Sequence, residues 1–354
     1  MTLAETRSAC IDLETLKAFS VSLLAEGGFP SPRAKEVADL LVWANARGMD
    51  SHGVLRIPRY IEMVEEGVIV PDAQPEIIHR AGAIAIQESG RAPGATAMCA
   101  AMDEAVAIAG THGIGWCSAR NITHAGAIGY YAMRAALAGH VGIVMTASGP
   151  LMAYHGAAVA SVSTNPLAIA APVGFGDPII LDMSTSNVAL GKIMAARDAG
   201  TPVPEGWGID KDGQATTNAA AVATLLPLGG PKGSGLSLMI EVLASLLCAN
   251  AIIAPALRGG EAGRMNGIAL ALNIAAFGSR AGFEEDLRQL ASTIRALPSA
   301  SGVDAILMPG ERGFRTEADR ALRGIPLARG TCKRLASLAD RFGIARPAAL
   351  RADL

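Results

Sequence analysis

Short apolar runs alternate with Ala-rich stretches between Glu76 and about Leu181, and this alternation constrains the fold more than any other feature. The apolar runs are 84–86, 143–145, 167–169 and 179–181, and the Ala-rich stretches are 97–109 and 130–137. Runs of this length rich in Ile, Val and Leu are typical of buried strands, whereas the Ala-rich stretches have helical spacing. Strands that alternate with helices predict an α/β fold.

Helical patterns precede this region. Residues 13–48 have helical periodicity that is broken at 27–32, where Ser31 is placed to cap a second helix with Pro32 at its first position. A third helix is predicted for about 57–66, because Pro58 suits the first turn of a helix.

The end of the chain is again helical in pattern. We therefore expect a helical N-terminal unit, residues 1–75, that is completed by about 314–354. The α/β unit then occupies 76–313. A length of 354 residues is consistent with about two domains.

The composition shows how such a chain builds its core. Hydrophobic residues make up 51% of the chain, charged residues 18% and aromatic residues only 4%. Ala, Leu, Ile and Val must therefore fill the interior, and small side chains let helices and strands approach closely. The five cysteines lie far apart without a CxxC pair, so we expect neither a metal site nor a disulfide framework.

Charge and hydropathy argue against two classes of partner. Thirty Lys and Arg against 32 Asp and Glu give a net charge of −2, and no basic stripe is interleaved with aromatics. We therefore expect no nucleic acid partner. No apolar run reaches the roughly 18 residues of a membrane span, and acidic residues stand where a signal peptide needs basic ones. We expect a cytoplasmic protein with no membrane partner.

His52 is the first of two histidines placed for proton transfer near neutral pH. If residues 50–60 form one helix, then His52, Arg56 and Tyr60 share one face. Pro58 opposes this, because a proline inside a helix removes a hydrogen bond and costs about 3 kcal/mol. In the alternative the helix begins near Pro58 and His52 lies on a capping turn with solvated charges. The pattern weights the two interpretations equally.

His124 is the second candidate. It lies between a predicted strand, 114–118, and a predicted helix, and strand-to-helix junctions often carry catalytic side chains. In the alternative Asn121 or Thr123 caps the helix, and His124 only bonds nearby backbone. For a single histidine the spacing by itself favours this alternative.

A glycine-rich segment, 229–235, contains Lys232 and precedes an apolar helix predicted for 236–247. Free backbone N–H groups and one cation at a helix start suit a phosphate group, although a flexible turn with a solvated lysine explains the pattern equally well. The segment is not a Walker motif, and no strand-coupled GxGxxG is present. A nicotinamide site, if present, must be built differently from that of a Rossmann domain.

Polar residues also follow several apolar runs. Asp182 directly follows the run 179–181 and is itself followed by three hydroxyl residues within 184–186. Such a group suits ribose hydroxyls, and it equally suits a capped helix start. The segments 148–150 and 163–166 are polar turns of the same kind.

Six ordered motifs together resemble the malate/L-lactate dehydrogenase family of the non-Rossmann type, over about 13–312. The motifs are RGMDSHGVLRIPRY (47–60), NITHAGAIGYY (121–131), STNPLAIAAP (163–172), LDMSTSNVALGK (181–192), LLPLGGPKGSGLSL (225–238) and MPGERG (308–313). That family also contains ureidoglycolate, sulfolactate, diketogulonate and cyclic-imine carboxylate oxidoreductases. The resemblance implies a non-Rossmann nicotinamide-binding α/β domain inserted into a helical domain, and a homodimer.

The resemblance also implies roles for individual residues. His124 and His52 are expected at the reacting centre, with His124 favoured as the acid and base. Arg56 is expected to hold the substrate carboxylate, because its planar fork suits paired hydrogen bonds. Tyr60 and Asn165 are expected to contact the substrate as well. The residues expected to bind NAD or NADP are Ser148, Asp182, Met183, Ser184, Lys232, Gly310, Glu311 and Arg312.

The implied reaction is hydride transfer between NAD(P) and C2 of a small 2-hydroxy or 2-oxo carboxylate, without a metal ion. Reduction of a cyclic imino acid and a non-catalytic ligand-binding role are the alternatives. Two positions depart from the family pattern: Ser163 stands where Gly is usual, and Ala125 where an aromatic residue is frequent. These departures bear on substrate fit, and the choice between NAD and NADP stays open.

Overall fold

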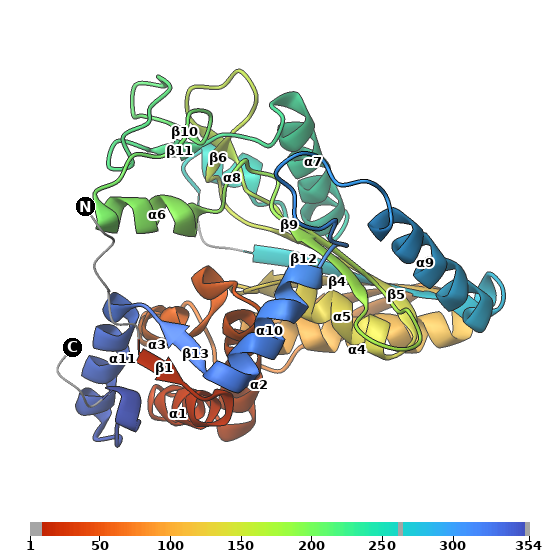
Figure 1. Cartoon of the computed structure of the whole chain (residues 1–354), viewed down its shortest axis with the longest axis horizontal. Helices are drawn as coiled ribbons and strands as arrows, with labels where there is room; N and C mark the ends of the chain where they lie inside the picture. Colours follow the sequence, from red (N-terminus) through yellow and green to blue (C-terminus); the bar gives the residue numbers. More distant parts are fainter. Residues whose placement is uncertain (1–8, 261–264, 351–354) are drawn as a thin grey trace.

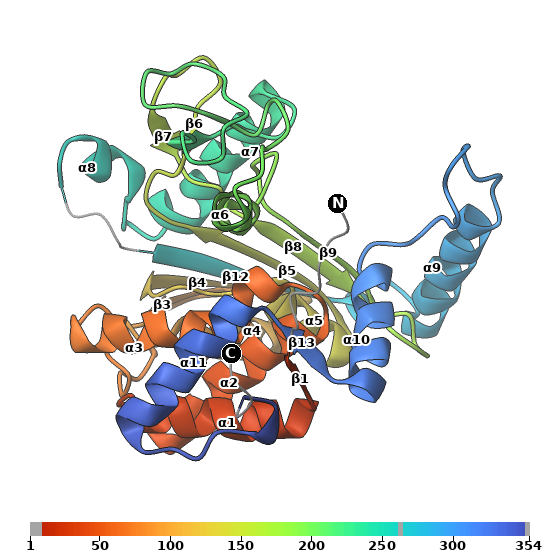
Figure 2. The same cartoon turned by 60° about the vertical axis from the view of Figure 1, so that its left-hand side comes forward.

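A seven-stranded sheet runs through the centre of the molecule and has helices on both faces (Figures 1 and 2). The computed structural model describes residues 9–260 and 265–350. In spatial order the strands are β2 (Glu76–Ala81), β3 (Ile84–Glu88), β4 (Ile114–Ile122), β12 (Met265–Asn273), β5 (His140–Ala147), β8 (Leu167–Ala171) and β9 (Ile179–Met183). Among these neighbours β3 and β4 are parallel, and each other pair is antiparallel.

The two faces of this sheet pack against different helices. Helices α4 (Gly94–His112) and α5 (Gly129–Leu137) cover one face, and α7 (Pro231–Glu241) with the π-helical turn Val242–Leu246 covers the other. Successive side chains of a strand point to opposite faces of the sheet. In β12, Ala269 belongs to the core shared with α4 and α5, whereas Ile268 packs with Ile240 of α7.

Glycines in the strands allow α4 and α5 to lie directly on the sheet. A Cβ at Gly115 would lie 2.0 Å from the carbonyl oxygen of Ala105, and one at Gly142 would lie 2.5 Å from that of Ala132. Any larger residue at these two positions would push the helix away. The core contains few aromatic side chains, and the helix backbone packs directly against the strand backbone instead.

A smaller sheet lies above the α7 face, with a core of its own. Its strand order is β10 (Gly208–Ile209), β11 (Thr224–Leu225), β6 (Met152–Ala153) and β7 (Ala160–Val162). Helix α6 (Leu190–Ala199) packs Ile193 into this core beside Met152, and α8 (Ile253–Leu257) follows α7 in the chain. Figure 1 shows this region across the sheet from the N-terminal helices.

The two ends of the chain meet in one helical unit. Helices α1 (Leu13–Glu26), α2 (Ser31–Ala46), α3 (Ile57–Glu65) and α11 (Arg329–Phe342) pack together. Strand β1 (Ala9–Ile11) pairs with β13 (Ile325–Leu327), which joins the first described residues to the C-terminal segment. Helices α9 (Arg280–Arg295) and α10 (Glu311–Arg323) lead from the large sheet back to this unit (Figure 2).

The structure confirms the predicted α/β class and the predicted strands and helices of 84–181. Two local predictions were wrong. Ser31 is the first residue of α2 rather than its cap, because Pro30 holds the extended cap conformation. The helix predicted for 236–247 begins at Pro231, so the glycine-rich segment is its first turn. The division at 75 and 313 stays a prediction. Within the described ranges, no helix combines the length and apolarity that a membrane span requires.

Candidate active site

His52 and His124 lie side by side, although they come from different parts of the fold. Their ring centroids are 5.9 Å apart and the ring planes differ by 15°. His52 ends the 3-10 turn Asp50–His52, which follows α2 in the helical unit. His124 is the second residue after β4 of the large sheet. The site therefore forms where the helical unit meets the sheet.

The backbone before α3 differs from a continuous helix. Two 3-10 turns, Asp50–His52 and Val54–Arg56, are separated by Gly53, and α3 begins at Ile57 with Pro58 in its first turn. Of the two interpretations of 50–60 that the sequence weighted equally, the one with a separate turn is confirmed: α3 begins near Pro58 and His52 lies on a turn before it. A Cβ at Gly53 would overlap the side chain of Asn45, which explains why the chain can pass so close to α2 there.

Hydrogen bonds hold both imidazole rings through the same nitrogen. The hydroxyl of Tyr60 lies 2.6 Å from Nδ1 of His124, and Oγ of Ser51 lies 2.9 Å from Nδ1 of His52. Among the described residues, neither Nε2 makes a hydrogen bond. Both Nε2 atoms therefore remain for an incoming molecule.

The surroundings favour neutral imidazoles. Burial, together with the charges of Arg56 and His52, lowers the pKa of His124 to about 3. Burial also lowers the pKa of His52 to about 4, again with help from Arg56. The pKa of Tyr60 is raised by burial, so its hydroxyl keeps its proton. At pH 7 both rings are therefore neutral and able to accept a proton.

Arg56 supplies positive charge next to the two rings. Its Nε donates to the carbonyl oxygen of Ser51 at 2.8 Å, which fixes the guanidinium plane. In the described parts of the chain its two terminal nitrogens have no hydrogen-bond partner. A carboxylate can therefore bind to this fork, where paired hydrogen bonds are strong and directional.

The turn that carries His124 is held by a buried polar network. Asn121 has a positive φ of 54°, and its side-chain amide donates to both carboxylate oxygens of Glu88 at 3.0 Å. Asn250 donates to the side-chain oxygen of Asn121, and Asn266 accepts from its backbone N–H. These groups come from four segments of the chain, so sequence spacing gave no signal for them.

The capping prediction for this turn was wrong. Thr123 donates its hydroxyl to the carbonyl oxygen of Ala92 rather than capping a helix. Helix α5 begins only at Gly129, with Ile128 at its cap position. His124 is consequently set on an irregular segment that packs against the start of α4.

Asp182 lies near the end of β9 and faces the start of α5. One carboxylate oxygen accepts a hydrogen bond from the backbone N–H of Gly129 at 2.8 Å. Burial raises the pKa of Asp182 to about 6, and the Gly129 bond and the charge of Arg47 oppose that rise. A cavity of about 190 Å³ adjoins it, lined by residues that include Arg47, Gly310 and Arg312.

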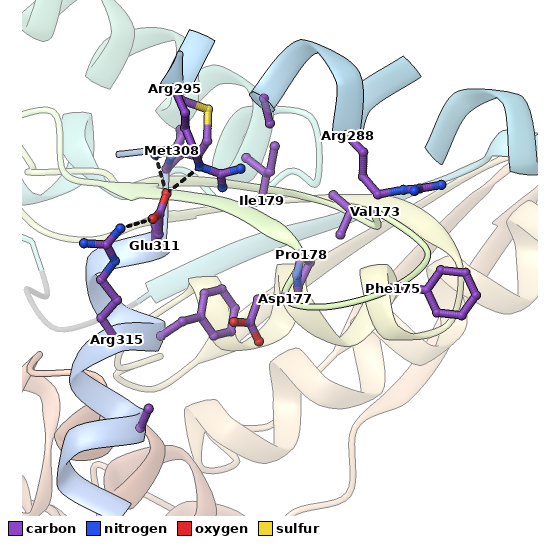
Figure 3. Close-up of a pocket in the computed structure, with 14 residues that line it drawn as sticks. Val173, Phe175, Asp177, Pro178, Ile179, Arg288, Arg295, Met308, Glu311 and Arg315 are labelled. Carbon is purple, nitrogen blue, oxygen red and sulfur yellow. Dashed lines mark hydrogen bonds and ion pairs between the residues drawn. The ribbon is translucent and has the colours of Figure 1, made fainter. Parts of the chain in front are cut away.

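The segment Gly310–Arg312 opens α10 beside this cavity. Gly310 has a φ of +85°, a conformation that glycine adopts without strain. The carboxylate of Glu311 accepts from the N–H of Met308 at 3.0 Å and pairs with Arg295 and Arg315 (Figure 3). A second cavity of about 570 Å³ lies between these residues and the segment before β9. Arg312 is exposed.

Ser148 and Asn165 form a second polar group, on the α7 side of the sheet. The N–H of Ser148 donates to the side-chain oxygen of Asn165 at 3.2 Å, and the hydroxyls of Ser148 and Ser163 lie 2.6 Å apart. Asn165 is 1% exposed and donates to the carbonyl oxygen of Ser237. Both polar atoms of the Asn165 side chain thus form hydrogen bonds with backbone groups. The contact of Asn165 with substrate stays a prediction. Ser163, which replaces the usual Gly, adds a hydroxyl to the group.

The remaining predicted residues, Met183, Ser184 and Lys232, lie at or just after the end of β9 or at the start of α7. Met183 is the last residue of β9, and the hydroxyl of Ser184 lies 3.0 Å from that of Ser186. No helix starts directly after β9, so these hydroxyls do not cap one. Lys232 is exposed in the first turn of α7 and forms no ion pair within the described ranges.

The donor and acceptor set fits a nicotinamide dinucleotide. A carboxylate at Asp182 suits ribose hydroxyls, and the unpaired Lys232 with the backbone N–H groups at the start of α7 suits a diphosphate. Cavities adjoin both Asp182 and Glu311. The described residues include no cluster of three or more His, Cys, Asp or Glu side chains placed to hold a metal ion.

Comparison with known proteins supports one family. The chain is 35% identical to a malate dehydrogenase of Pyrococcus horikoshii over 342 residues, which cover 94% of this chain and 95% of the relative. It is 34% identical to an NAD(+)-dependent ureidoglycolate dehydrogenase of Escherichia coli over 322 residues, which cover 90% and 92%.

Solved structures of dehydrogenases and reductases are also similar to this chain. A malate dehydrogenase of Entamoeba histolytica matches with a TM-score of 0.90 and 26% identity, covering 96% of this chain and all of the other. A delta1-piperideine-2-carboxylate reductase of Pseudomonas syringae matches with a TM-score of 0.81 and 26% identity, covering 93% and 99%. The family model described as malate/L-lactate dehydrogenase matches residues 11–336. The chain therefore belongs to the malate/L-lactate dehydrogenase family.

Proposed function

We propose that this protein is an oxidoreductase that acts at C2 of a small 2-hydroxy or 2-oxo carboxylate with NAD or NADP. One observation carries the proposal: two neutral imidazoles, His52 and His124, lie together beside the guanidinium of Arg56, and no described residue bonds to their Nε2 atoms. A carboxylate on Arg56 brings the neighbouring C2 oxygen toward the imidazoles. The relatives named as malate and ureidoglycolate dehydrogenases act on molecules of this class.

The residues of the chain divide the work of the reaction. Arg56 binds and orients the carboxylate. His124 accepts the proton of the C2 hydroxyl at Nε2 during oxidation and returns it during reduction, while Tyr60 holds the ring at Nδ1. A nicotinamide cofactor, when bound, would supply or accept the hydride. His52, whose ring lies beside that of His124, is proposed to contact the substrate as well.

The cofactor is proposed to lie along β9, between the start of α7 and the start of α10. Asp182 with Met183 and Ser184 would meet the ribose region, and Ser148 and Lys232 the region toward α7. Gly310, Glu311 and Arg312 would hold the opposite end. The mostly antiparallel order of the sheet differs from the parallel sheet of a Rossmann domain, which supports a non-Rossmann cofactor domain inserted between the two helical segments.

A cyclic imino acid is the second candidate substrate. Its ring carbon carries a carboxylate next to a C=N bond, so the same guanidinium and proton donor would serve. The structural likeness to a delta1-piperideine-2-carboxylate reductase favours this candidate. The third candidate belongs to a different class of function. In it, the protein keeps the family's fold and binds a ligand but catalyses no reaction.

We also propose that the protein is a cytoplasmic homodimer. Large apolar side chains are exposed along α7, the π-helical turn and α8, namely Leu238, Met239, Leu246, Leu247 and Leu257. An apolar group of this kind suits a second copy of the chain, since monomers rarely expose contiguous apolar surface. Cys10, Cys99, Cys117 and Cys248 are free thiols, as expected in a reducing compartment. Light scattering of the purified protein measures the assembly state.

The test follows nicotinamide absorbance with 2-oxo acids, 2-hydroxy acids and cyclic imines, each with NAD and NADP in the matching redox state. Turnover on the 2-oxo and 2-hydroxy acids is the expected result. Turnover on the imines alone would replace the main candidate by the second. If neither cofactor is turned over or bound, the non-catalytic alternative holds.

A further inference from the structure

Arg47 follows the last residue of α2, and its guanidinium is enclosed between two aromatic rings. Its central carbon lies 5.1 Å from the ring centroid of Trp43 and 3.7 Å from that of Phe314. The side chain is only 3% exposed. Burying a charged guanidinium costs free energy unless hydrogen bonds and an opposite charge compensate it, so the partners of Arg47 fix its position.

Those partners belong to α10 and to its N-cap residue, Gly310. One terminal nitrogen of Arg47 donates to Glu317 at 2.9 Å, and the other donates to the carbonyl oxygen of Gly310 at 3.2 Å. Phe314, which stacks on the guanidinium, lies on the same helix. Arg47 therefore ties the helical unit to the residues predicted to hold one end of the cofactor.

The far side of Gly310 is limited by β9. The N–H of Ile180 donates to the carbonyl oxygen of Pro309 at 3.1 Å, and a Cβ at Gly310 would lie 3.0 Å from the carbonyl oxygen of Ile180. Gly310 thus lies between a strand and the guanidinium of Arg47. A Cβ at Gly313 would lie 3.0 Å from that guanidinium, so the helix start leaves just enough room for it.

We propose that Arg47 is a positioning residue, which holds the Gly310–Arg312 segment beside Asp182 so that the nicotinamide dinucleotide can bind. The inference rests on the proposed function and deepens it. Each terminal nitrogen of Arg47 donates to a protein group, and the role assigned to Arg47 is the one it exerts through Gly310. Its charge also opposes the burial-driven rise in the pKa of Asp182.

The test compares cofactor binding by Arg47→Lys and Arg47→Met with the unchanged protein, titrating NADH and NADPH by fluorescence. Loss of a hydrogen bond from a charged donor predicts that Arg47→Met raises the cofactor Kd about 10- to 100-fold. Arg47→Lys keeps the charge without the planar fork, so its effect should be intermediate. At saturating cofactor, kcat should change less than about 3-fold, because the lost interaction affects binding of the cofactor and not the proton transfer.

Arg341 offers a matched control. It also pairs with a carboxylate, Glu65, and lies 5.1 Å from the ring centroid of Phe342, but its side chain is 55% exposed on α11. Arg341→Lys should leave the cofactor Kd unchanged. Glu317→Gln is a milder variant for the case that Arg47 variants do not fold, since it loosens the guanidinium without emptying its place, and it should raise Kd by a smaller factor.

The outcomes separate the two proposals. If the unchanged protein binds neither cofactor, the proposed function fails and this inference fails with it. If the unchanged protein binds a cofactor and the Arg47 and Glu317 variants bind it equally well, only this inference is overturned. A lower unfolding temperature with an unchanged Kd would likewise show that Arg47 only stabilises the fold.

Discussion

The hydroxyl of Tyr60 lies 2.6 Å from Nδ1 of His124, which joins a residue of α3 to the segment after β4. Tyr60 is 5% exposed, and its raised pKa keeps the hydroxyl protonated. The bond sets the orientation of the imidazole and leaves Nε2 for the substrate. A catalytic histidine commonly needs a partner of this kind, because the bond at one ring nitrogen decides what the other can do.

Tyr60→Phe is expected to lower kcat by about 10-fold or more, because Nδ1 of His124 loses the hydroxyl that holds it. The KM for the carboxylate should change little, since Arg56 is untouched. Steady-state kinetics on the best substrate provide the measurement. A kcat equal to that of the unchanged protein would remove Tyr60 from the reaction.

Replacing His124 with Asn is expected to reduce kcat about 100- to 10,000-fold, the usual contribution of a well-placed acid or base. Cofactor binding should persist, because His124 does not belong to the β9 group. His52→Asn is the comparison and should mainly raise the substrate KM. If His52→Asn loses turnover and His124→Asn does not, the two roles are exchanged.

Arg56→Lys is expected to raise the substrate KM at least about 10-fold, since an ammonium cannot form the paired hydrogen bonds of a guanidinium. The fold should survive, because among the residues that the structure describes Arg56 makes one side-chain hydrogen bond, to the carbonyl oxygen of Ser51. Arg59→Lys on the exposed face of α3 is the control. Normal steady-state constants for Arg56→Lys would contradict the carboxylate role.

Protonation of the histidine pair is expected to destabilise the fold in acid. The pKa values of His52 and His124 are about 4 and about 3 in the folded protein, against about 6.5 for an unfolded histidine. Because the folded values are lower, the unfolded state binds more protons, and stability present above pH 6.5 is lost as the pH falls through 4 toward 3. Urea unfolding across this range should show a smaller loss for His124→Asn. An unchanged pH dependence in that variant would show that the ring titrates normally.

Asp182→Asn is expected to separate stability from function. The pKa of Asp182 is raised to about 6, so its favourable contribution belongs to the protonated form, is present below pH 3.8 and is lost as the pH rises through 6. At pH 7 the neutral amide should therefore raise the free energy of unfolding, while the cofactor Kd also rises. Denaturant unfolding and cofactor titration at pH 7 measure the two effects. A less stable variant would argue that the carboxylate is well solvated.

Several features could be predicted because they depend on neighbours along the chain. The period of apolar residues located the strands and helices between 84 and 181, since burial of one face follows from that period. The motifs around His52, His124 and Asp182 pointed to the family, because a site keeps its residue types at fixed spacing. Local signals located the ends of helices less accurately. Ser31 is the first residue of α2 and not its cap, and α7 begins at Pro231, before the predicted start.

The tertiary structure decided which side chains meet. His52 and Tyr60 approach His124 because two 3-10 turns and α3 fold against the end of β4. The sequence had left open whether residues 50–60 form one helix or a turn followed by a helix. The network around Asn121 and the enclosure of Arg47 draw on segments far apart in sequence. The sequence by itself determined the local periods and the residue types available for chemistry. Distance, burial and the resulting pKa values arise only when the chain packs, because they depend on groups that no local pattern connects.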